Sequence, residues 1–490
     1  MIRSSTNKSL RYLVLAFSMV ILAQLIFGVY VYAFENRMGG ISLSMSALCS
    51  LVAILPFVLG LRKFDLFSPL CLFAAALTLG SMLRVAYVFS YQDSNSRANF
   101  LLFGSSFEEL TWSSFYVFFG VISFVIGYLI NTKRVRLNSL ITFSSFDISE
   151  KRLFLVAVVF GVFGAVMGAI FLSKAGIDIS AGLLKASAKA FISYEGTDGA
   201  VSVGTGFERF LAKFAEFPFV VICCLLMIKE VKRKQVAIVL CCCLAIPVLL
   251  IPFLYSSRSA VVLSFITIII FAYYFGKVTV TQIVVGVITI ICVITVMGQL
   301  RFENKTQAVQ QRTVMDAFIG SGNGIDFIRT AGIIDRVAED SRYLHGKTYS
   351  YVFAIFIPRA FWSSKPEIGL GPYIKSEIFN GREVDKNGWP SGMIGEAYLN
   401  FGLMGVFLGM ALYGWLASLV NNTFRPHLGV SYTVTFLYAF IAWRFGFGLP
   451  GLNLAHGLSQ VLTIMIPALL FLYLVRTKRV RIPTRFTSPI

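Results

Sequence analysis

Apolar runs of membrane-spanning length dominate this sequence. A transmembrane helix needs about 20 consecutive apolar residues to cross the hydrocarbon core. Twelve such runs occur, at 12–34, 41–61, 67–90, 111–131, 152–173, 208–228, 236–256, 259–276, 279–299, 393–420, 430–450 and 453–475. The sequence therefore predicts an all-α polytopic membrane protein with about 12 transmembrane helices.

The charge content agrees with a lipid-solvated chain. Only 14% of the residues are charged, against about 25% in soluble domains. The net charge of +19 would suggest nucleic acid as a partner of a soluble protein. Here most of the excess lies in short loops and at the termini, where the positive-inside rule accounts for it. We therefore expect no nucleic-acid partner.

The basic loops predict the orientation. Cationic residues precede the first run and then appear in alternate loops and in the tail, as expected if all these segments are cytoplasmic. Opposite short loops carry few cations. An even number of helices places both termini in the cytoplasm. The segments on the cytoplasmic side contain Arg3, Lys8, Arg11, Arg62, Lys63, Lys133, Arg134, Arg136, Lys151, Arg152, Lys229, Lys232, Arg233, Lys234, Lys277, Arg425 and Arg476.

Two outward segments are long, and the larger one divides the chain. We expect an N-terminal bundle of about nine helices over 1–299, a large extracytoplasmic loop with short helices over 300–392, and three C-terminal helices with a basic tail over 393–490. The smaller segment, 174–207, suggests a short amphipathic helix around Ala181–Tyr194. In the large loop, Tyr351–Trp362 is apolar but too short to span, so we expect it at the membrane surface.

Ionisable residues within the runs fall in the outer halves of the helices. Placing a charged residue inside the membrane costs at least about 2.5–3.5 kcal/mol even on the lenient insertion scale, so the presence of these residues requires an explanation. Lys213 and Glu216 are three apart on one face, and a structural pair is as reasonable as a function. The arginines suggest an anionic ligand, because a guanidinium donates two parallel hydrogen bonds to phosphate. We expect a pyrophosphate to bind at least two of Arg84, Arg258, Arg301 and Arg444.

The other side chains offer weaker signals. Trp362 and Trp389 lie in the large loop and are candidates for stacking on sugars, although an aromatic belt at the membrane surface is the alternative. All eight cysteines fall in apolar runs, where we expect buried small hydrophobic residues. The three histidines are scattered, and no DxD motif is present. We therefore expect no metal site and no cofactor.

Several strings, in order, resemble one family. They are Ser256-Ser-Arg-Ser-Ala, Gly346-Lys-Thr-Tyr, Ile357-Pro-Arg-Ala-Phe-Trp, Lys365-Pro and Ile394-Gly-Glu-Ala-Tyr-Leu-Asn-Phe-Gly-Leu-Met-Gly. Together with the large loop before the last helices, they resemble the Wzy-type oligosaccharide repeat-unit polymerases of O-antigen and capsule synthesis. The resemblance is densest over 256–405, whereas the first 250 residues match only in hydropathy.

The resemblance implies a reaction and a place. Such enzymes work on the outer face of the bacterial cytoplasmic (inner) membrane. They transfer a growing glycan from undecaprenyl pyrophosphate to the sugar of an incoming lipid-linked repeat unit. The resemblance also implies kinship with GT-C-like glycosyltransferases, which suits the absence of a predicted metal site. A chain-length regulator and a flippase are the expected protein partners.

Chemistry and position suggest roles for particular residues. Preorganised cations must stabilise the pyrophosphate leaving group, and we nominate Arg258, Arg301 and Arg359, with help from Lys365. Arg359 has the alternative role of an interfacial anchor. Glu396 is the preferred general base, His345 is the second candidate, and Asn400 is expected to orient the acceptor or simply to pack. A capping or ion-pair role is the structural alternative for Glu396.

Three other functions remain open from the sequence, of which a structural or assembly subunit leaves the buried arginines unexplained. A lipid-linked oligosaccharide flippase could have a similar helix number and a cationic cavity. However, its substrate crosses the membrane, and the inner halves of these helices are almost free of charge. An O-antigen ligase has the same chemistry with a different acceptor, and only the strings near Ile357 and Ile394 favour a polymerase.

Overall fold

The computed structural model describes residues 2–62, 64–91, 102–130, 148–174, 201–228, 231–254, 258–300, 319, 325–357, 362, 364–379, 389–426 and 432–476. The predicted helix around Ala181–Tyr194 lies outside these residues. The first helices are α1 (Ile2–Phe34), α2 (Arg37–Val58), α3 (Pro69–Leu77), the π-turn η1 (Thr78–Leu83), α4 (Arg84–Phe89) and α6 (Phe107–Ile130). Next come α7 (Glu150–Lys174), α9 (Val201–Ala212), η4 (Lys213–Ala215), α10 (Glu216–Ile228), α11 (Lys234–Leu254), α12 (Arg258–Tyr274) and α13 (Val280–Leu300).

The C-terminal part contains the large loop and the last helices. The loop carries α15 (Phe327–Asp340), α16 (Lys347–Ala354), α17 (Gly371–Tyr373) and η6 (Ile374–Ile378). They are followed by α18 (Gly392–Phe424), α19 (Tyr432–Trp443), η7 (Arg444–Gly448), η8 (Leu449–Gly451) and α20 (Leu454–Val475).

Each of the twelve apolar runs coincides with one helix or with several short helical segments that follow one another along the chain. Over the described residues, nine helical segments are long and apolar enough to cross a membrane, and Val261–Tyr274 and Val280–Val293 are shorter apolar helices. The remaining run, 430–450, is divided among α19, η7 and η8. The prediction of an all-α polytopic membrane protein is confirmed.

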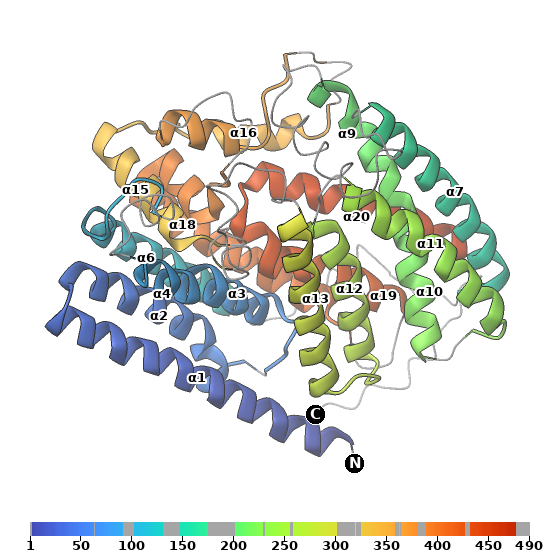
Figure 1. Cartoon of the computed structure of the whole chain (residues 1–490), viewed down its shortest axis with the longest axis horizontal. Coiled ribbons are helices and arrows are strands. Elements are labelled where there is room, and N and C mark those ends of the chain that lie inside the picture. The colour runs from blue at the N-terminus through green and yellow to red at the C-terminus, as the bar shows by residue number, and fades with distance from the viewer. Residues whose placement is uncertain are drawn as a thin grey trace.

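The helices form two groups with separate hydrophobic cores (Figure 1). The first group contains α1–α6 together with α15 and α18. The second contains α7, α10, α11, α12, α19 and α20. A smaller core joins them, where Phe67, just before α3, and Leu72 of α3 cluster with Ile270 of α12 and Tyr438 of α19. The two groups therefore share an apolar seam.

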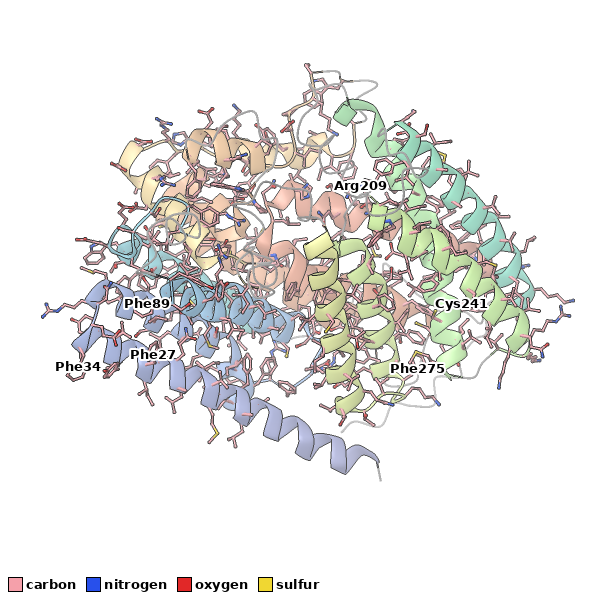
Figure 2. The ribbon with its side chains drawn as sticks, in the orientation of Figure 1. Phe27, Phe34, Phe89, Arg209, Cys241 and Phe275 are labelled. Carbon is pink, nitrogen blue, oxygen red and sulfur yellow. The ribbon has the colours of Figure 1, made fainter. Side chains whose placement is uncertain are left out.

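The outer helices present apolar side chains outward. Phe34 at the end of α1 is 76% exposed and projects from the molecule (Figure 2), and Met19, Leu155 and Val239 are more than half exposed. In a membrane, lipid covers such faces without the cost of meeting water. Our expectation that all the cysteines are buried within the protein is wrong for part of the set, because these faces include the exposed Cys242, Cys243 and Cys292.

The large loop packs on the first group through α15. Phe327, Ile333 and Ile334 of this helix are at most 1% exposed. At its start the backbone of Ile325 approaches η1 so closely that a Cβ on Gly80 would lie 1.4 Å from the Ile325 carbonyl oxygen, so only glycine fits. By contrast, Phe353 and Phe356 beyond α15 are 77% and 69% exposed. These are the apolar side chains that we expect at the membrane surface.

Candidate functional site

A break in α18 lies at the centre of the candidate site. Phe401 has φ −139° and ψ 20°, and Gly402 has φ 59° and ψ −146°, so the helical path stops and restarts there. Residues other than glycine rarely adopt the second conformation. The break frees the carbonyl groups of Leu399 and Asn400, which accept hydrogen bonds from the backbone N–H groups of Leu344 at 2.8 Å and His345 at 3.1 Å. The loop is thus joined directly to α18.

Glu396 connects this loop to two helices. Its side chain is 0% exposed. One carboxylate oxygen accepts a hydrogen bond from the Thr348 hydroxyl at 2.8 Å, and the other accepts from the Leu454 backbone N–H at 2.6 Å. The first donor belongs to α16 and the second opens α20. Among the described residues Glu396 has no ion-pair partner, so of the two structural alternatives the geometry matches capping.

Asn400 completes the connection. Its side-chain amide donates to the Thr348 hydroxyl at 2.7 Å and to the Glu396 carbonyl at 2.8 Å. Its side-chain oxygen accepts from the Gly346 N–H at 3.0 Å. We call Glu396, Asn400, Thr348 and Leu454 the Glu396 junction. It unites the two strings, Gly346-Lys-Thr-Tyr and Ile394 onward, that carry most of the sequence resemblance.

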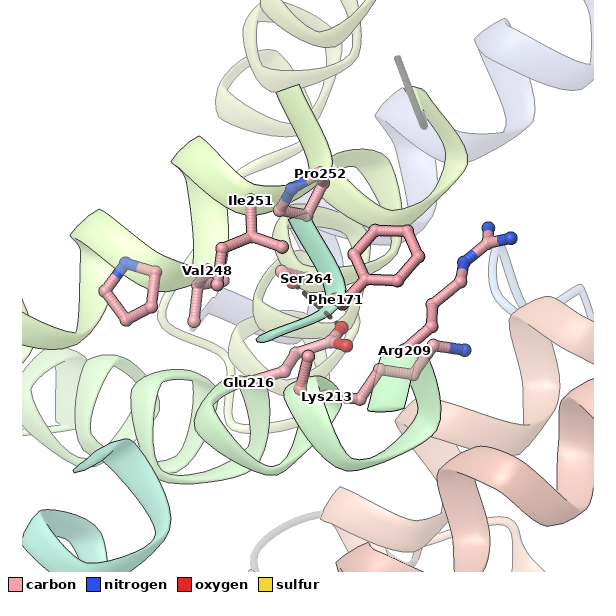
Figure 3. A pocket seen from close by; sticks show the side chains of 10 residues that line it. Phe171, Arg209, Lys213, Glu216, Val248, Ile251, Pro252 and Ser264 are labelled. Carbon is pink, nitrogen blue, oxygen red and sulfur yellow. Dashed lines mark hydrogen bonds between the residues drawn. The ribbon is translucent and has the colours of Figure 1, made fainter. Parts of the chain in front are cut away.

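A pocket with about 400 Å³ of empty space lies in the second helix group. Arg209 and Lys213 reach it from α9 and η4, and Glu216 reaches it from the start of α10. Figure 3 shows the Glu216 carboxylate facing Ser264 of α12, whose hydroxyl donates to it at 2.9 Å. Apolar residues form the other walls, namely Phe171, Ala212, Pro247, Val248, Ile251 and Pro252.

Arg444 and His456 do not line this pocket, but both interact electrostatically with residues that do. Arg444 of η7 donates to Gln460, whose amide lies 2.8 Å from His456 Nε2. The Nε atom of Arg444 is buried and has no hydrogen-bond partner among the described residues. The charges of Arg209, Arg444 and Lys213 all act on His456, and those of Lys213 and Arg444 act on Glu216.

We call Arg209, Lys213, Glu216, Arg444 and His456 the cation pocket. Over the described residues it brings three cations together with one carboxylate, within apolar helices. In a low-dielectric setting such an excess of positive charge favours an anion. We therefore treat the cation pocket as a candidate anion site.

The Glu396 junction and the cation pocket meet at the first turn of α20. Leu454 belongs to the junction and His456, two residues later, belongs to the pocket. Asn453 ties the same turn to the loop, since it donates to the Ile368 carbonyl at 2.8 Å and accepts from the Leu370 N–H at 3.3 Å. A Cβ on Gly369 would lie 3.8 Å from His456 Nδ1, so the loop reaches the edge of the pocket.

Of the arginines expected to bind pyrophosphate whose side chains the structure describes, Arg444 is the one that interacts electrostatically with a residue of this pocket. Arg84 is 1% exposed and forms a 2.8 Å ion pair with Asp326, so it has a protein anion where we expected a ligand. Arg258 begins α12, the helix that carries Ser264, but its side chain is not described. Arg301 and Arg359 lie outside the described residues.

The remaining predicted residues lie in and around the loop. Lys365 donates to the Ile357 carbonyl at 2.8 Å. Trp362 is 36% exposed and available at the surface. Trp389 instead packs against Phe103 and Phe379, with ring centroids 4.8 and 5.3 Å away, so its ring fills a protein contact in place of the expected sugar.

His345 has a backbone role in the observed arrangement. Its backbone N–H joins the loop to α18, while the residue itself is exposed, with φ 47°. The structure does not place its imidazole in the cation pocket or in the Glu396 junction.

Sequence reasoning missed Arg209 and gave no role to His456. The helical spacing of the ionisable residues could have revealed Arg209, because positions 209, 213 and 216 follow the i, i+4, i+7 pattern and so share one face of a helix. His456 could be recognised only from its neighbours, which come from η4 and η7.

Comparison with known proteins supplies the family. Residues 12–476 match the family O-antigen polysaccharide polymerase Wzy. No curated protein and no solved structure matches the chain. Because the family match covers nearly the whole chain, this protein belongs to the O-antigen polysaccharide polymerase Wzy family.

Proposed function

We propose that this polymerase takes the growing glycan from undecaprenyl pyrophosphate and transfers it to an incoming lipid-linked repeat unit at the outer face of the cytoplasmic membrane. The family acts on lipid-linked oligosaccharide repeat units. The observation that supports the donor chemistry is the cation pocket. A chain-length regulator and a flippase stay expected partners of the reaction.

The cation pocket suits a pyrophosphate leaving group. Negative charge grows on this group as the glycosidic bond breaks, and preorganised cations lower the energy of that transition state. The charges of Arg209, Lys213 and Arg444 all act on His456, so the three cations lie near one another. Within the described residues no three His, Cys, Asp or Glu side chains are grouped as metal ligands. We therefore assign the stabilisation of the leaving group to Arg209, Lys213 and Arg444.

The surroundings suit the two other parts of the substrates. The apolar walls of the pocket, including Phe171 and Ile251, match a polyprenyl chain that approaches from the lipid. The loop residues at 368–370, held by Asn453, lie at the edge of the pocket beside His456. We place the sugars of donor and acceptor on this loop side, where Trp362 and Lys365 also lie.

Complementation of a polymerase-deficient strain tests the proposal. The wild-type chain should restore polymer ladders, and Lys213→Ala and Arg444→Ala should each reduce long chains about tenfold or more, because each removes a charge-assisted contact to the leaving group. Exposed Arg342, in the loop, supplies the matched control, and Arg342→Ala should leave the ladder intact.

The accumulated intermediate separates the polymerase from its alternatives. Cells that carry the inactive variants should display single repeat units outside. Retention of lipid-linked units inside the cell would identify a flippase, and accumulation of lipid-linked polymer would identify a ligase. Normal ladders from well-expressed Lys213→Ala and Arg444→Ala variants would overturn the donor site.

A further inference from the structure

We propose that Glu396 is a positioning residue, whose carboxylate fixes the external loop and the first turn of α20 in one arrangement and carries no proton in the reaction. This inference rests on the proposed function, since it concerns how the same site is held together. It also replaces our expectation from the sequence that Glu396 is the general base.

Burial of the carboxylate and its hydrogen bonds to two protein donors support this role. Glu396 is 0% exposed, so an acceptor hydroxyl has no path to it in the observed arrangement. Each of its oxygens already accepts a hydrogen bond, one from Thr348 and one from the Leu454 N–H. A general base needs a lone pair within about 2.6–3.2 Å of the proton that it removes. Here a protein donor occupies one lone pair on each oxygen, and burial closes the carboxylate to an approaching hydroxyl.

The identity of the two donors shows what the carboxylate controls. Thr348 belongs to the first turn of α16, whereas Leu454 is the first residue of α20. A carboxylate at a helix N-terminus satisfies an otherwise unpaired N–H and interacts favourably with the helix dipole. The α20 helix therefore begins at a place set by Glu396, and His456 follows two residues later, beside the cations.

The loop residues also make several contacts within the junction. Burial raises the pKa of the Tyr349 hydroxyl, and the charge of Glu396 raises this pKa further. Asn400 binds Thr348 and Gly346 from the adjacent turn of α18. The loop, α18 and α20 thus share one buried polar network, in which loss of one member leaves others unpaired.

Two substitutions separate positioning from proton transfer. In Glu396→Gln the amide oxygen can accept from Leu454 and the amide N–H can donate to the Thr348 hydroxyl, so the connection survives while the carboxylate is lost. In Glu396→Ala both connections are lost. If Glu396 is a positioning residue, Glu396→Gln should retain polymerisation and Glu396→Ala should lose it. If Glu396 transfers a proton, both variants should be inactive.

The experiment measures polymerisation and local structure separately. Polymer ladders and their pH dependence report the reaction. Hydrogen exchange of the purified chain in lipid nanodiscs, over residues 344–354 and 453–458, reports the junction without any need for activity. Glu377→Ala, at an exposed glutamate of the same loop, is the control and should match the wild type in both measurements.

We expect Glu396→Ala to lower polymerisation and to speed exchange in both segments by about tenfold or more, because buried donors lose their acceptor. Glu396→Gln should stay within about threefold of the wild type in both measurements, with an unchanged pH profile, since its amide retains hydrogen bonds to both partners.

Two results would overturn the inference. One is loss of polymerisation in Glu396→Gln with unchanged exchange, which would restore the proton-transfer role. The other is unchanged exchange in Glu396→Ala. If the wild-type chain itself restores no ladder, the proposed function fails, and the exchange measurement still decides whether Glu396 holds the junction.

Discussion

At the scale of single residues, Arg84 shows how a charged side chain within an apolar helix can pair with a protein group instead of binding a ligand. Its Nε donates to Asp326 at 2.8 Å, and Arg329 lies 3.0 Å from the other oxygen of that carboxylate. All three residues are at most 5% exposed. Asp326 also caps α15, by accepting from the Arg329 N–H. One carboxylate therefore holds two buried cations and the start of a loop helix.

Asp326→Ala should destabilise the folded chain by about 3–5 kcal/mol, because it leaves buried guanidinium groups without their counter-charge. The measurement is the thermal unfolding midpoint of the purified protein in detergent. Asp340→Ala, at an exposed ion pair with Arg342, is the comparison and should change the midpoint little. An unchanged midpoint in Asp326→Ala, with loss of polymer, would return Arg84 to ligand binding.

The sequence could identify Arg84 as exceptional but could not supply its partner. Asp326 lies 242 positions away, in a loop whose fold the apolar pattern does not constrain. Arg444 was found by the same reasoning, and we propose that it contributes to an anion site. The two arginines have similar sequence surroundings, so only tertiary contacts distinguish a structural cation from a candidate binding group.

At the scale of elements, irregular turns determine which side chains and backbone groups the apolar helices present. The π-turn η1 ends just before Arg84, and η7 begins at Arg444. Such turns inside helices are frequent at functional sites, because they shift the side chains that follow. In α18 the break at Gly402 has a different effect, since it exposes carbonyl groups to which the loop binds.

Gly402→Ala should weaken the attachment of the loop, because a Cβ is strained at φ 59° and ψ −146°. The cost should be about 1–3 kcal/mol. Hydrogen exchange at Leu344 and His345 should accelerate, and polymer ladders should shorten. Gly409→Ala tests the specificity of the effect, because this glycine has no positive φ and a Cβ there meets only ordinary contacts. Equal behaviour of the two variants would contradict the role of the break.

Element length and type were predictable, whereas interruptions were not. Twenty apolar residues specify a helix through local backbone bonding and lipid solvation alone. The run 393–420 accordingly predicted one helix at the right place. Its break at Phe401 and Gly402 depends on the residues at 344 and 345, which form the compensating hydrogen bonds, and so the run by itself could not show it.

At the scale of the whole molecule, the two helix groups meet where the candidate site lies. The junction attaches α18 of the first group to α20 of the second, and the pocket lies on the second group beside it. The alternation of basic loops predicted which side faces the cytoplasm, and the family supports a multi-pass membrane protein. Orientation itself stays a prediction.

Thiol labelling can test this orientation. In a chain whose native cysteines are replaced, Ser364→Cys in the large loop should react with a membrane-impermeant maleimide in intact spheroplasts. Lys232→Cys, after α10, should react only after permeabilisation. Both original residues are exposed, so accessibility within the protein is matched. The reverse pattern would place the candidate site on the cytoplasmic side and contradict the proposed reaction.

The Glu396 junction has a consequence for biogenesis. Its members lie at positions 348, 396, 400 and 454, and α20, which Leu454 opens, is the last helix of the described chain. Because synthesis proceeds from the N-terminus, the loop emerges well before the final donor exists. A nascent chain that ends before Leu454 holds Glu396 with one oxygen unpaired. Assembly of the site therefore waits for insertion of the last helix, so an incompletely inserted chain lacks this junction.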